Sequence, residues 1–335
     1  MQMVIIAYAS LMLAPLANAQ KYHAFIWNSS SGLTDLGTLG GDTSYALGIN
    51  DSGEVVGYSY LADNVTRHAF TWTASGGMVD LGTLPGGTWS QGEKINASGE
   101  ISGEALDSNG RQVPVFWSAG TGFVSLGETH TRDSRNYGYS INDSGVVTGQ
   151  VYIGAVVNAI YWRRGGAVHL LPPIPNGGLH MVGYDINNRD HVTGNGSWSD
   201  GRWEAFFWSR TRGTVGIGFV PDAYSTLGHG INDNDEVTGL ATFIGSAVTT
   251  GFYWNSHTGI VLLQTLGGAT GAGLDINLAG AIAGWSSNAS EEIHAVLWSN
   301  YTSLPQDLGT LPGGTISYAY SINSSGQVVG FSTVP

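Results

Sequence analysis

The dipeptide Ile-Asn recurs seven times along this chain, at intervals of 45 or 46 residues, and this recurrence limits the possible folds more than any other feature. The seven asparagines are Asn50, Asn96, Asn142, Asn187, Asn232, Asn277 and Asn323. A tryptophan keeps the same interval, at Trp27, Trp72, Trp117, Trp162, Trp208, Trp254 and Trp298. A glycine also follows each of these asparagines by seven residues. Self-similarity at a period of this length is the signature of a repeat architecture.

Each period contains four short runs rich in β-branched and aromatic residues. In residues 41–84 the runs are SYALGIN, EVVGYSY, RHAFTWT and MVDLGTL, and they are separated by Gly, Asn, Asp and Ser. Such runs are typical of strands, and short connections make consecutive strands antiparallel neighbours. Four strands in about 45 residues is the period of a propeller blade. Glycine at 51 of 335 residues and only 11% charged residues also fit many short strands joined by tight turns.

The two ends of the repeat array are complementary. After residue 20 the chain begins with the third and fourth strands of a period, KYHAFIW and TDLGTLG, and it ends with a first and a second, SYAYSIN and QVVGFST. We therefore predict an all-β fold: a seven-bladed β-propeller of four-stranded antiparallel blades, closed by a composite N-/C-terminal blade. An open stack of β-meanders is the alternative. The repeated tryptophans are expected to wedge between blades, and Trp117→Ala is expected to cost about 3–5 kcal/mol.

The first residues have the character of an export signal. The segment 4–16 is apolar but shorter than the roughly 20 residues that span a bilayer, and it is followed by Ala17-Asn18-Ala19, a cleavage pattern. We predict a signal peptide at 1–19 and one propeller domain at 20–335, in a secreted or periplasmic product without a membrane anchor. The formal charge of −13 and the lack of a basic run argue against nucleic acid as a partner.

Several motifs in the repeats resemble a known family. His23-Ala24-Phe25 and His68-Ala69-Phe70 each precede a repeated Trp, and His294-Ala295-Val296 is a degenerate copy. Together with the segments DLGTLGG and DLGTLPGG and the recurring IND-x-G and VVG, they resemble the bacterial extracellular HAF repeat over residues 21–335. The resemblance implies export and a repeat fold, and it transfers no catalytic residue. We expect the three histidines to be structural hydrogen-bonding groups.

Candidate binding residues follow from the geometry of a four-stranded meander. The turns between strands 1 and 2 and between strands 3 and 4 lie on one face, the turn face. The 2→3 loops and the crossings between blades lie on the other, the loop face. The loop face carries the residues that do not repeat, and loops on a rigid scaffold often bind ligands. From it we select Trp89, Arg135, His180, Trp198, Arg202, Trp203 and Trp285.

The first strands are expected to line a central channel. Two residues before each Ile of the Ile-Asn pairs stand Leu47, Glu93, Tyr139, Tyr184, His229, Leu274 and Tyr320. One residue before it stand Gly48, Lys94, Ser140, Asp185, Gly230, Asp275 and Ser321. Strict alternation places the two sets on opposite sides of each strand and leaves open which set meets the channel. Tyr139, Tyr184 and His229 complete the set of candidate ligand-binding residues.

No nucleophile, nucleotide-binding or zinc-protease motif is present, and Asn232–Glu236, which resembles a calcium loop, falls on the turn that every repeat uses. We therefore assign no catalytic residue, cofactor or metal and expect a monomer. The favoured function is an exported, non-catalytic module that binds a carbohydrate, another extracellular polymer or a protein partner through one face. Replacing Trp198 and Trp203 together would then abolish binding. The alternative is a polysaccharide-degrading enzyme, a lyase or glycoside hydrolase, with Tyr139, Tyr184, His180 and His229 as acid–base candidates.

Overall fold

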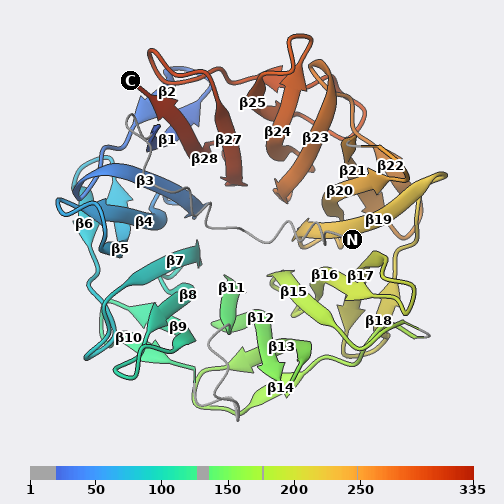
Figure 1. Cartoon of the computed structure of the whole chain (residues 1–335), viewed down its shortest axis with the longest axis horizontal. Helices are drawn as coiled ribbons and strands as arrows, with labels where there is room; N and C mark the ends of the chain where they lie inside the picture. The colour runs from blue at the N-terminus through green and yellow to red at the C-terminus, as the bar shows by residue number, and fades with distance from the viewer. Residues whose placement is uncertain (1–19, 127–135, 176, 247) are drawn as a thin grey trace.

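The computed structural model describes residues 20–126, 136–175, 177–246 and 248–335, and every regular element in these ranges is a β-strand. The strands form seven four-stranded antiparallel blades around a central axis (Figure 1). The predicted fold class is therefore confirmed. The expected signal peptide and Arg135 lie outside the described residues.

The composite blade contains, from its innermost to its outermost strand, β27 (Ser317–Ile322), β28 (Val328–Val334), β1 (Lys21–Asn28) and β2 (Gly32–Asp35). Blade 1 contains β3 (Gly40–Ile49), β4 (Val55–Leu61), β5 (Arg67–Thr73) and β6 (Gly77–Asp80). Blade 2 contains β7 (Ser90–Ile95), β8 (Ile101–Leu106), β9 (Gln112–Ser118) and β10 (Gly122–Ser125). Blade 3 contains β11 (Tyr137–Ile141), β12 (Val146–Ile153), β13 (Val156–Arg163) and β14 (Val168–Leu170).

Blade 4 contains β15 (Met181–Ile186), β16 (Val192–Ser197), β17 (Trp203–Ser209) and β18 (Gly213–Gly216). Blade 5 contains β19 (Ala223–Ile231), β20 (Val237–Phe243), β21 (Thr249–Asn255) and β22 (Gly259–Leu262). Blade 6 contains β23 (Gly267–Ile276), β24 (Ile282–Asn288), β25 (Ile293–Trp298) and β26 (Gln306–Asp307). In blades 1–6 the first strand in sequence is the innermost, and in the composite blade β27, the first strand of its repeat, takes this place, so seven first strands of repeats surround the axis (Figure 1).

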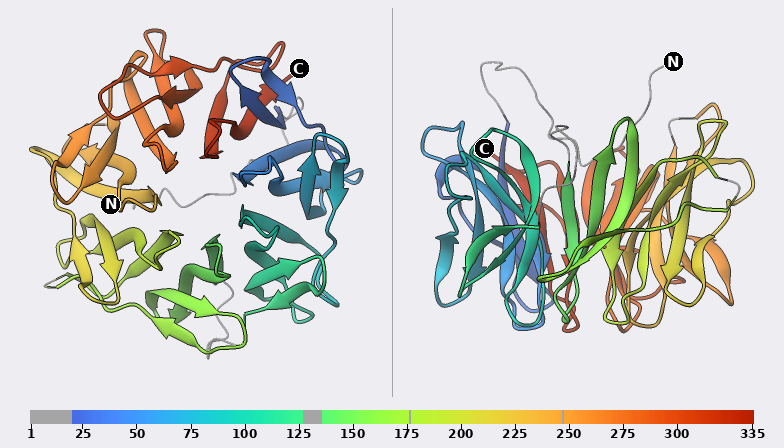
Figure 2. Two further views of the ribbon diagram at one scale, coloured as in Figure 1. Left: turned by 180° about the vertical axis from the view of Figure 1, so that it is seen from behind. Right: turned by 90° about the horizontal axis from the view of Figure 1, so that it is seen from below.

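The two ends of the chain close the ring by direct strand pairing. Strand β28 pairs antiparallel with β1 from Lys21 opposite Val334 to Trp27 opposite Val328. Seen from either face, the C-terminal strand lies beside the first described strand (Figures 1 and 2). This pairing contradicts an open stack of meanders and leaves neither β28 nor β1 with an unpaired edge.

The repeated tryptophans pack between blades, as predicted. Trp27 of the composite blade contacts a cluster that includes residues of blade 6, and Trp162 of blade 3 packs with Phe116 of blade 2. Trp298 is the most deeply buried of the seven, with 1% of its surface exposed. Trp72, Trp117 and Trp254 are only half-buried, so the repeat position does not bury every copy equally.

In every repeat a Gly or Ala lies three positions before the Ile of the Ile-Asn pair. Contact between neighbouring blades explains why this residue is small. A Cβ atom added to Gly92 would lie 2.4 Å from Cγ2 of Val56, on the second strand of the preceding blade. A Cβ atom on Gly273 would lie 2.0 Å from Oγ1 of Thr238, again on the preceding blade. A larger residue at these positions would therefore collide with the preceding blade.

The seven repeated asparagines form a closed ring of hydrogen bonds. Each Nδ2 group donates to the main-chain oxygen of the corresponding asparagine in the next blade, and the last bond joins Asn323 to the oxygen of Asn50 across the chain ends. The Oδ1 atom of Asn50 also accepts the amides of Ser52 and Glu54, as a turn residue does. The asparagine thus both forms a turn and links neighbouring blades.

Candidate functional site

Both sets of first-strand residues face the central channel, which corrects the expectation from strict alternation. All seven first strands shift register at this point; in β3 the shift lies between Ala46 and Gly48. A β-bulge adds one unpaired residue and bends the strand, so consecutive side chains no longer alternate strictly. Consequently Glu93 and Lys94, which are neighbours in sequence, both line the inner channel.

The middle of the channel brings together three of the predicted site residues. The ring of Tyr184 packs at 5.1 Å from Tyr139 and at 5.2 Å from His229, measured between centroids. Burial raises the pKa values of both tyrosines and lowers that of His229 to about 4, so the imidazole is neutral near pH 7. The cavity that these residues line measures only about 20 Å³. A space of this size holds about one water molecule and no sugar.

Two buried carboxyl groups lie on blade 2, close to this cavity. Glu93 accepts a hydrogen bond from Nε2 of Gln91, and burial raises its pKa to about 7 although Gln91, Arg67 and Lys94 lower it. Burial also raises the pKa of Glu104, and the charge of Glu93 raises it further. Oε2 of Glu104 has no hydrogen-bond partner within the described ranges. These carboxyl groups are therefore protonated at a higher pH than exposed ones.

The raised pKa of Glu93 predicts that removal of its charge stabilises the folded protein, and that the size of this effect depends on pH. Between the ordinary value of 4.5 and about 7, the folded protein holds a proton that the unfolded chain releases, so stability falls as the pH rises through this window. Glu93→Gln retains the acceptor for Gln91. It is expected to raise the free energy of unfolding by about 2–3 kcal/mol at pH 8 and to leave it unchanged at pH 4. Urea denaturation at both pH values measures the difference; exposed Glu292→Gln is the control, and a gain at pH 4 alone would contradict the prediction.

Aromatic side chains of blade 6, the composite blade and blade 1 pack against one another. We call this set the aromatic belt; it consists of Tyr22, Tyr45, Tyr58, Trp285, Tyr318 and Phe331. Tyr45 stacks on Tyr58 at 4.9 Å and meets Phe331 edge-on at 4.8 Å. Tyr318 joins Phe331 to Trp285, at 5.1 and 5.6 Å respectively. All members except Phe331 are half-buried, and burial raises the pKa values of Tyr45 and Tyr58.

Arg67 connects this belt to Trp89, one of the predicted binding residues. Its guanidinium lies 5.0 Å from the ring centre of Tyr58 and 4.4 Å from that of Trp89, both within cation–π range. Two of the residues chosen from the sequence, Trp89 and Trp285, therefore lie at the two ends of one aromatic surface. The sequence analysis missed the tyrosines between them, although aromatic residues at corresponding positions of adjacent repeats were a visible signal.

The Trp198–Glu204 segment is occupied by internal contacts. The indole of Trp198 donates to Oε2 of buried Glu204 at 2.8 Å. The guanidinium of Arg202 pairs with Asp200 and lies over the rings of Trp198 and Phe219. These contacts stabilise a tight hairpin, closed by the backbone bonds between Trp198 and Arg202 and between Gly201 and Trp198. The segment therefore has a structural role whether or not it binds a ligand.

The remaining predicted residues have local partners. Trp203 is half-buried at the start of β17, and its amide donates to Oγ of Ser225 on the next blade. His180 accepts the amide of Val157 at Nδ1. The three HAF histidines each bond an aspartate of the outermost strand in the same blade, with His23 and Asp35 2.8 Å apart. The expected structural role of these three histidines is confirmed.

The turn face holds a larger cavity than the channel centre, which the sequence analysis did not anticipate. This cavity, which we call the funnel, has a volume of about 280 Å³ and is lined by five of the seven ring asparagines. Its inner end is formed by Lys94, Ser140, Asp185, Asp275 and Ser321, and its mouth carries Asp51, Asp143 and Asp233. The spacing of the seven asparagines indicated that they occupy equivalent positions in the repeats, but it did not predict a cavity between them.

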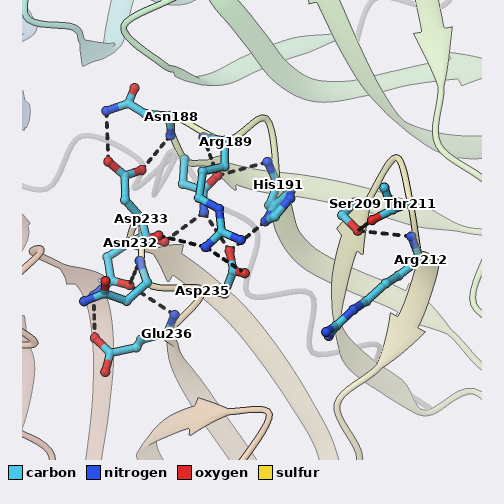
Figure 3. Close-up of polar contacts among 12 residues, drawn as sticks. Asn188, Arg189, His191, Ser209, Thr211, Arg212, Asn232, Asp233, Asp235 and Glu236 are labelled. Atoms are coloured by element: carbon cyan, nitrogen blue, oxygen red, sulfur yellow. Dashed lines mark hydrogen bonds and ion pairs between the residues drawn. The ribbon is translucent and has the colours of Figure 1, made fainter.

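Figure 3 shows how the turns at the funnel mouth are held together between blades 4 and 5. The side chain of Asn188 donates to Asp233, while His191 and Arg189 pair with Asp235. Asp235 stands where most repeats have glycine and adopts a φ of 61°, a conformation that few residues other than glycine tolerate. It also accepts a bond from the ring residue Asn187. In blade 1 the Nδ2 group of Asn50 donates instead to the carboxylate of Glu54 in the same blade. Asp235 therefore gives Asn187 a carboxylate acceptor that comes from the next blade.

No protein-family model and no curated protein matches the chain. Its structure is similar to that of a putative TolB from Agrobacterium tumefaciens, with a TM-score of 0.55 and 11% identity, over 95% of this chain and 99% of that one. It is also similar to the β-propeller domain of the trilobed protease from Pyrococcus furiosus (TM-score 0.55, 9% identity), over 83% of this chain and 85% of that one. An oligogalacturonate lyase in complex with manganese matches with a TM-score of 0.54 at 9% identity, over 94% and 98% of the two chains.

At these identities the likeness establishes the β-propeller fold alone, since one fold hosts many functions. The similar proteins themselves differ in function, as their names show. No group of three metal-ligating side chains occurs within the described ranges. No helix in the same ranges is long and apolar enough to cross a membrane. Any function must therefore be argued from the surfaces of this chain.

Proposed function

We propose that this protein is an exported, non-catalytic binding module that recognises a carbohydrate polymer through its loop face. The aromatic belt is the observation that carries the proposal. Sugar rings present apolar faces that stack on aromatic side chains, while their hydroxyl groups require hydrogen-bonding neighbours. The belt offers half-buried rings from three adjacent blades, an extent that suits several consecutive sugar units.

Polar groups beside the belt support the same ligand class. Arg67 lies between Tyr58 and Trp89 and presents a guanidinium at the edge of the aromatic surface. Guanidinium groups donate several hydrogen bonds in a fixed plane and pair well with hydroxyls and carboxylates. A polymer that carries hydroxyl groups, with or without acidic groups, therefore complements this surface better than a purely apolar ligand would.

The enzymatic alternative has weaker support. Its candidates Tyr139, Tyr184 and His229 do come together, but the space they enclose is about 20 Å³. Binding pockets for small ligands usually measure about 300–1,000 Å³. A glycosidic bond could not reach these groups without a large rearrangement of the inner strands. Turnover that disappears in His229→Ala or Tyr184→Phe would nevertheless overturn the non-catalytic assignment.

Substitution of Trp285, at one end of the belt, and of Trp89, beside Arg67 at the other end, tests the proposal. Trp89→Ala combined with Trp285→Ala removes two half-buried rings and is expected to weaken binding at least about tenfold in a protein that still unfolds cooperatively. A glycan array identifies the ligand, and titration calorimetry measures the affinity. The matched control is Trp198→Ala with Trp203→Ala, which lies on the same face and should retain binding. If the control loses affinity and the belt variant does not, the site lies at the Trp198 hairpin.

A further inference from the structure

The funnel on the turn face has no part in the proposed carbohydrate site, yet it is a built cavity. It has a volume of about 280 Å³, lies on the axis of the ring, and is lined by residues of all seven blades. Its charged side chains are those of Lys94, Asp185 and Asp275 at the inner end and of Asp51, Asp143 and Asp233 at the mouth. Five carboxylates and one ammonium leave the cavity strongly acidic.

An ammonium group already occupies one side of the inner end. Nζ of Lys94, reaching from blade 2, donates to Oδ2 of Asp275 at 2.6 Å and to Oγ of Ser321 at 3.0 Å. Ser321 also donates to the same carboxylate oxygen at 2.6 Å. A carboxylate and a hydroxyl at these distances form a suitable site for an alkylammonium ion.

Asp185, on the other side of the inner end, has no cation of its own. Its carboxylate accepts hydrogen bonds from Oγ of Ser140 and the amide of Ile231, and only 6% of the residue is exposed. No lysine, arginine or histidine nitrogen forms an ion pair with it in the described part of the chain. Lys94, whose charge also acts on Asp185, is bonded to Asp275, so the inner end holds two buried carboxylates and one ammonium, and an excess buried charge is costly. The raised pKa of Asp185, about 6, has the same origin: burial raises it, Lys94 lowers it and Asp275 raises it.

We propose that the funnel binds a short aliphatic diamine, with one ammonium on Asp185 and the other among the carboxylates of the mouth. The ligand supplies a second cation to an inner end that has two carboxylates and one ammonium, and its other charge neutralises part of the acidic mouth. The carboxylates come from separate blades, and no three metal-ligating groups within the described ranges come close enough to hold one metal ion. A flexible organic cation fits this dispersed arrangement better than a metal ion does.

Calorimetric titration of the full mature chain with 1,4-diaminobutane at pH 8 and low salt tests the proposal. We expect saturable binding with one site, weaker binding of 1-aminobutane, and none of 1-butanol. Affinity should fall at pH 5, where Asp185 takes up a proton, and at high salt, which screens the charges. Absence of diamine binding at pH 8, or equal binding of the neutral alcohol, would overturn the proposal.

Three variants assign the binding to the funnel. Asp185→Asn is expected to weaken diamine binding by about tenfold or more. Exposed Asp222→Asn, on the loop face, makes the same change of charge and should bind as the wild type does. Lys94→Met removes the competing ammonium and is expected to strengthen binding, so a loss of fold in one variant cannot explain both results. Wild-type affinity in Asp185→Asn, or Asp185-dependent binding of Ca²⁺ in place of the diamine, would refute it. None of these outcomes depends on the carbohydrate site.

Discussion

Deletion of residues 316–335 is expected to abolish cooperative folding. The deletion removes β27 and β28, so β1 loses the partner to which it is paired over seven residues. It also breaks the asparagine ring at Asn323, which bonds Asn50 and accepts from Asn277. Without β27 and β28, blades 1 and 6 would each expose an apolar face, and β1 would expose an unpaired edge. Urea denaturation and light scattering should show a broad transition and aggregation in place of one cooperative unfolding.

A circular permutant tests whether the missing strands, and not the changed position of the chain ends, cause the loss of cooperative unfolding. Since Lys21 lies opposite Val334, a short glycine linker can join Pro335 to Gln20 as a hairpin turn. A permutant that begins at Gly314 and ends at Gly313 keeps all four strands of the composite blade. It is expected to unfold as cooperatively as the natural order does. If the truncated chain melts like the intact one, the composite blade contributes little to folding and our account of closure is wrong.

Trp298→Ala is expected to destabilise the protein by about 3–5 kcal/mol, the usual cost of truncating a large buried aromatic residue. Trp298 packs with Tyr253, Ile276 and Val296 between blades 5 and 6, and its indole donates to the main-chain oxygen of Gln264. The loss is a large part of a typical stability of about 5–15 kcal/mol. Urea denaturation of the purified variant measures the change.

Trp117→Ala provides the matched comparison for Trp298→Ala. The sequence analysis assigned Trp117 the full cost of a buried aromatic, but the structure shows this residue half-buried. Its truncation is therefore expected to cost less, about 1.5–3 kcal/mol. Equal losses in the two variants would mean that exposure does not control the contribution of the repeated tryptophans. Trp298→Phe should recover part of the stability, because the ring still fills the space between blades.

The repeat itself made the fold predictable. A period of 45 or 46 residues with four strand-like runs, and half-blades at the two ends, led to seven blades and a composite closure. These features are local or periodic, so each repeat independently supports the same conclusion. The turn positions of Asp190 and Asp235 were also predictable, since few residues other than glycine adopt positive φ, and both do so.

The candidate site was less predictable, because its residues belong to different blades. The sequence correctly selected Tyr139, Tyr184 and His229 as channel residues, whereas Trp285, expected in a loop of the loop face, lies within β24. It did not show that Trp89 and Trp285 end one aromatic surface, nor that Trp198 and Arg202 are occupied by Glu204 and Asp200. Such contacts depend on how neighbouring blades are rotated against each other, and strand periodicity carries no information about that rotation.

The sequence alone determined the strand order, the number of blades, the closure and the turn chemistry, because each of these follows from propensities and spacings within a repeat. Only the tertiary structure decided which side chains face the channel, since a β-bulge in every first strand cancels the alternation that a regular strand would impose. The same bulges bring Lys94, Asp185 and Asp275 into one cavity, although they are separated by up to 181 residues. Their proximity arises from ring closure, a property of the whole chain.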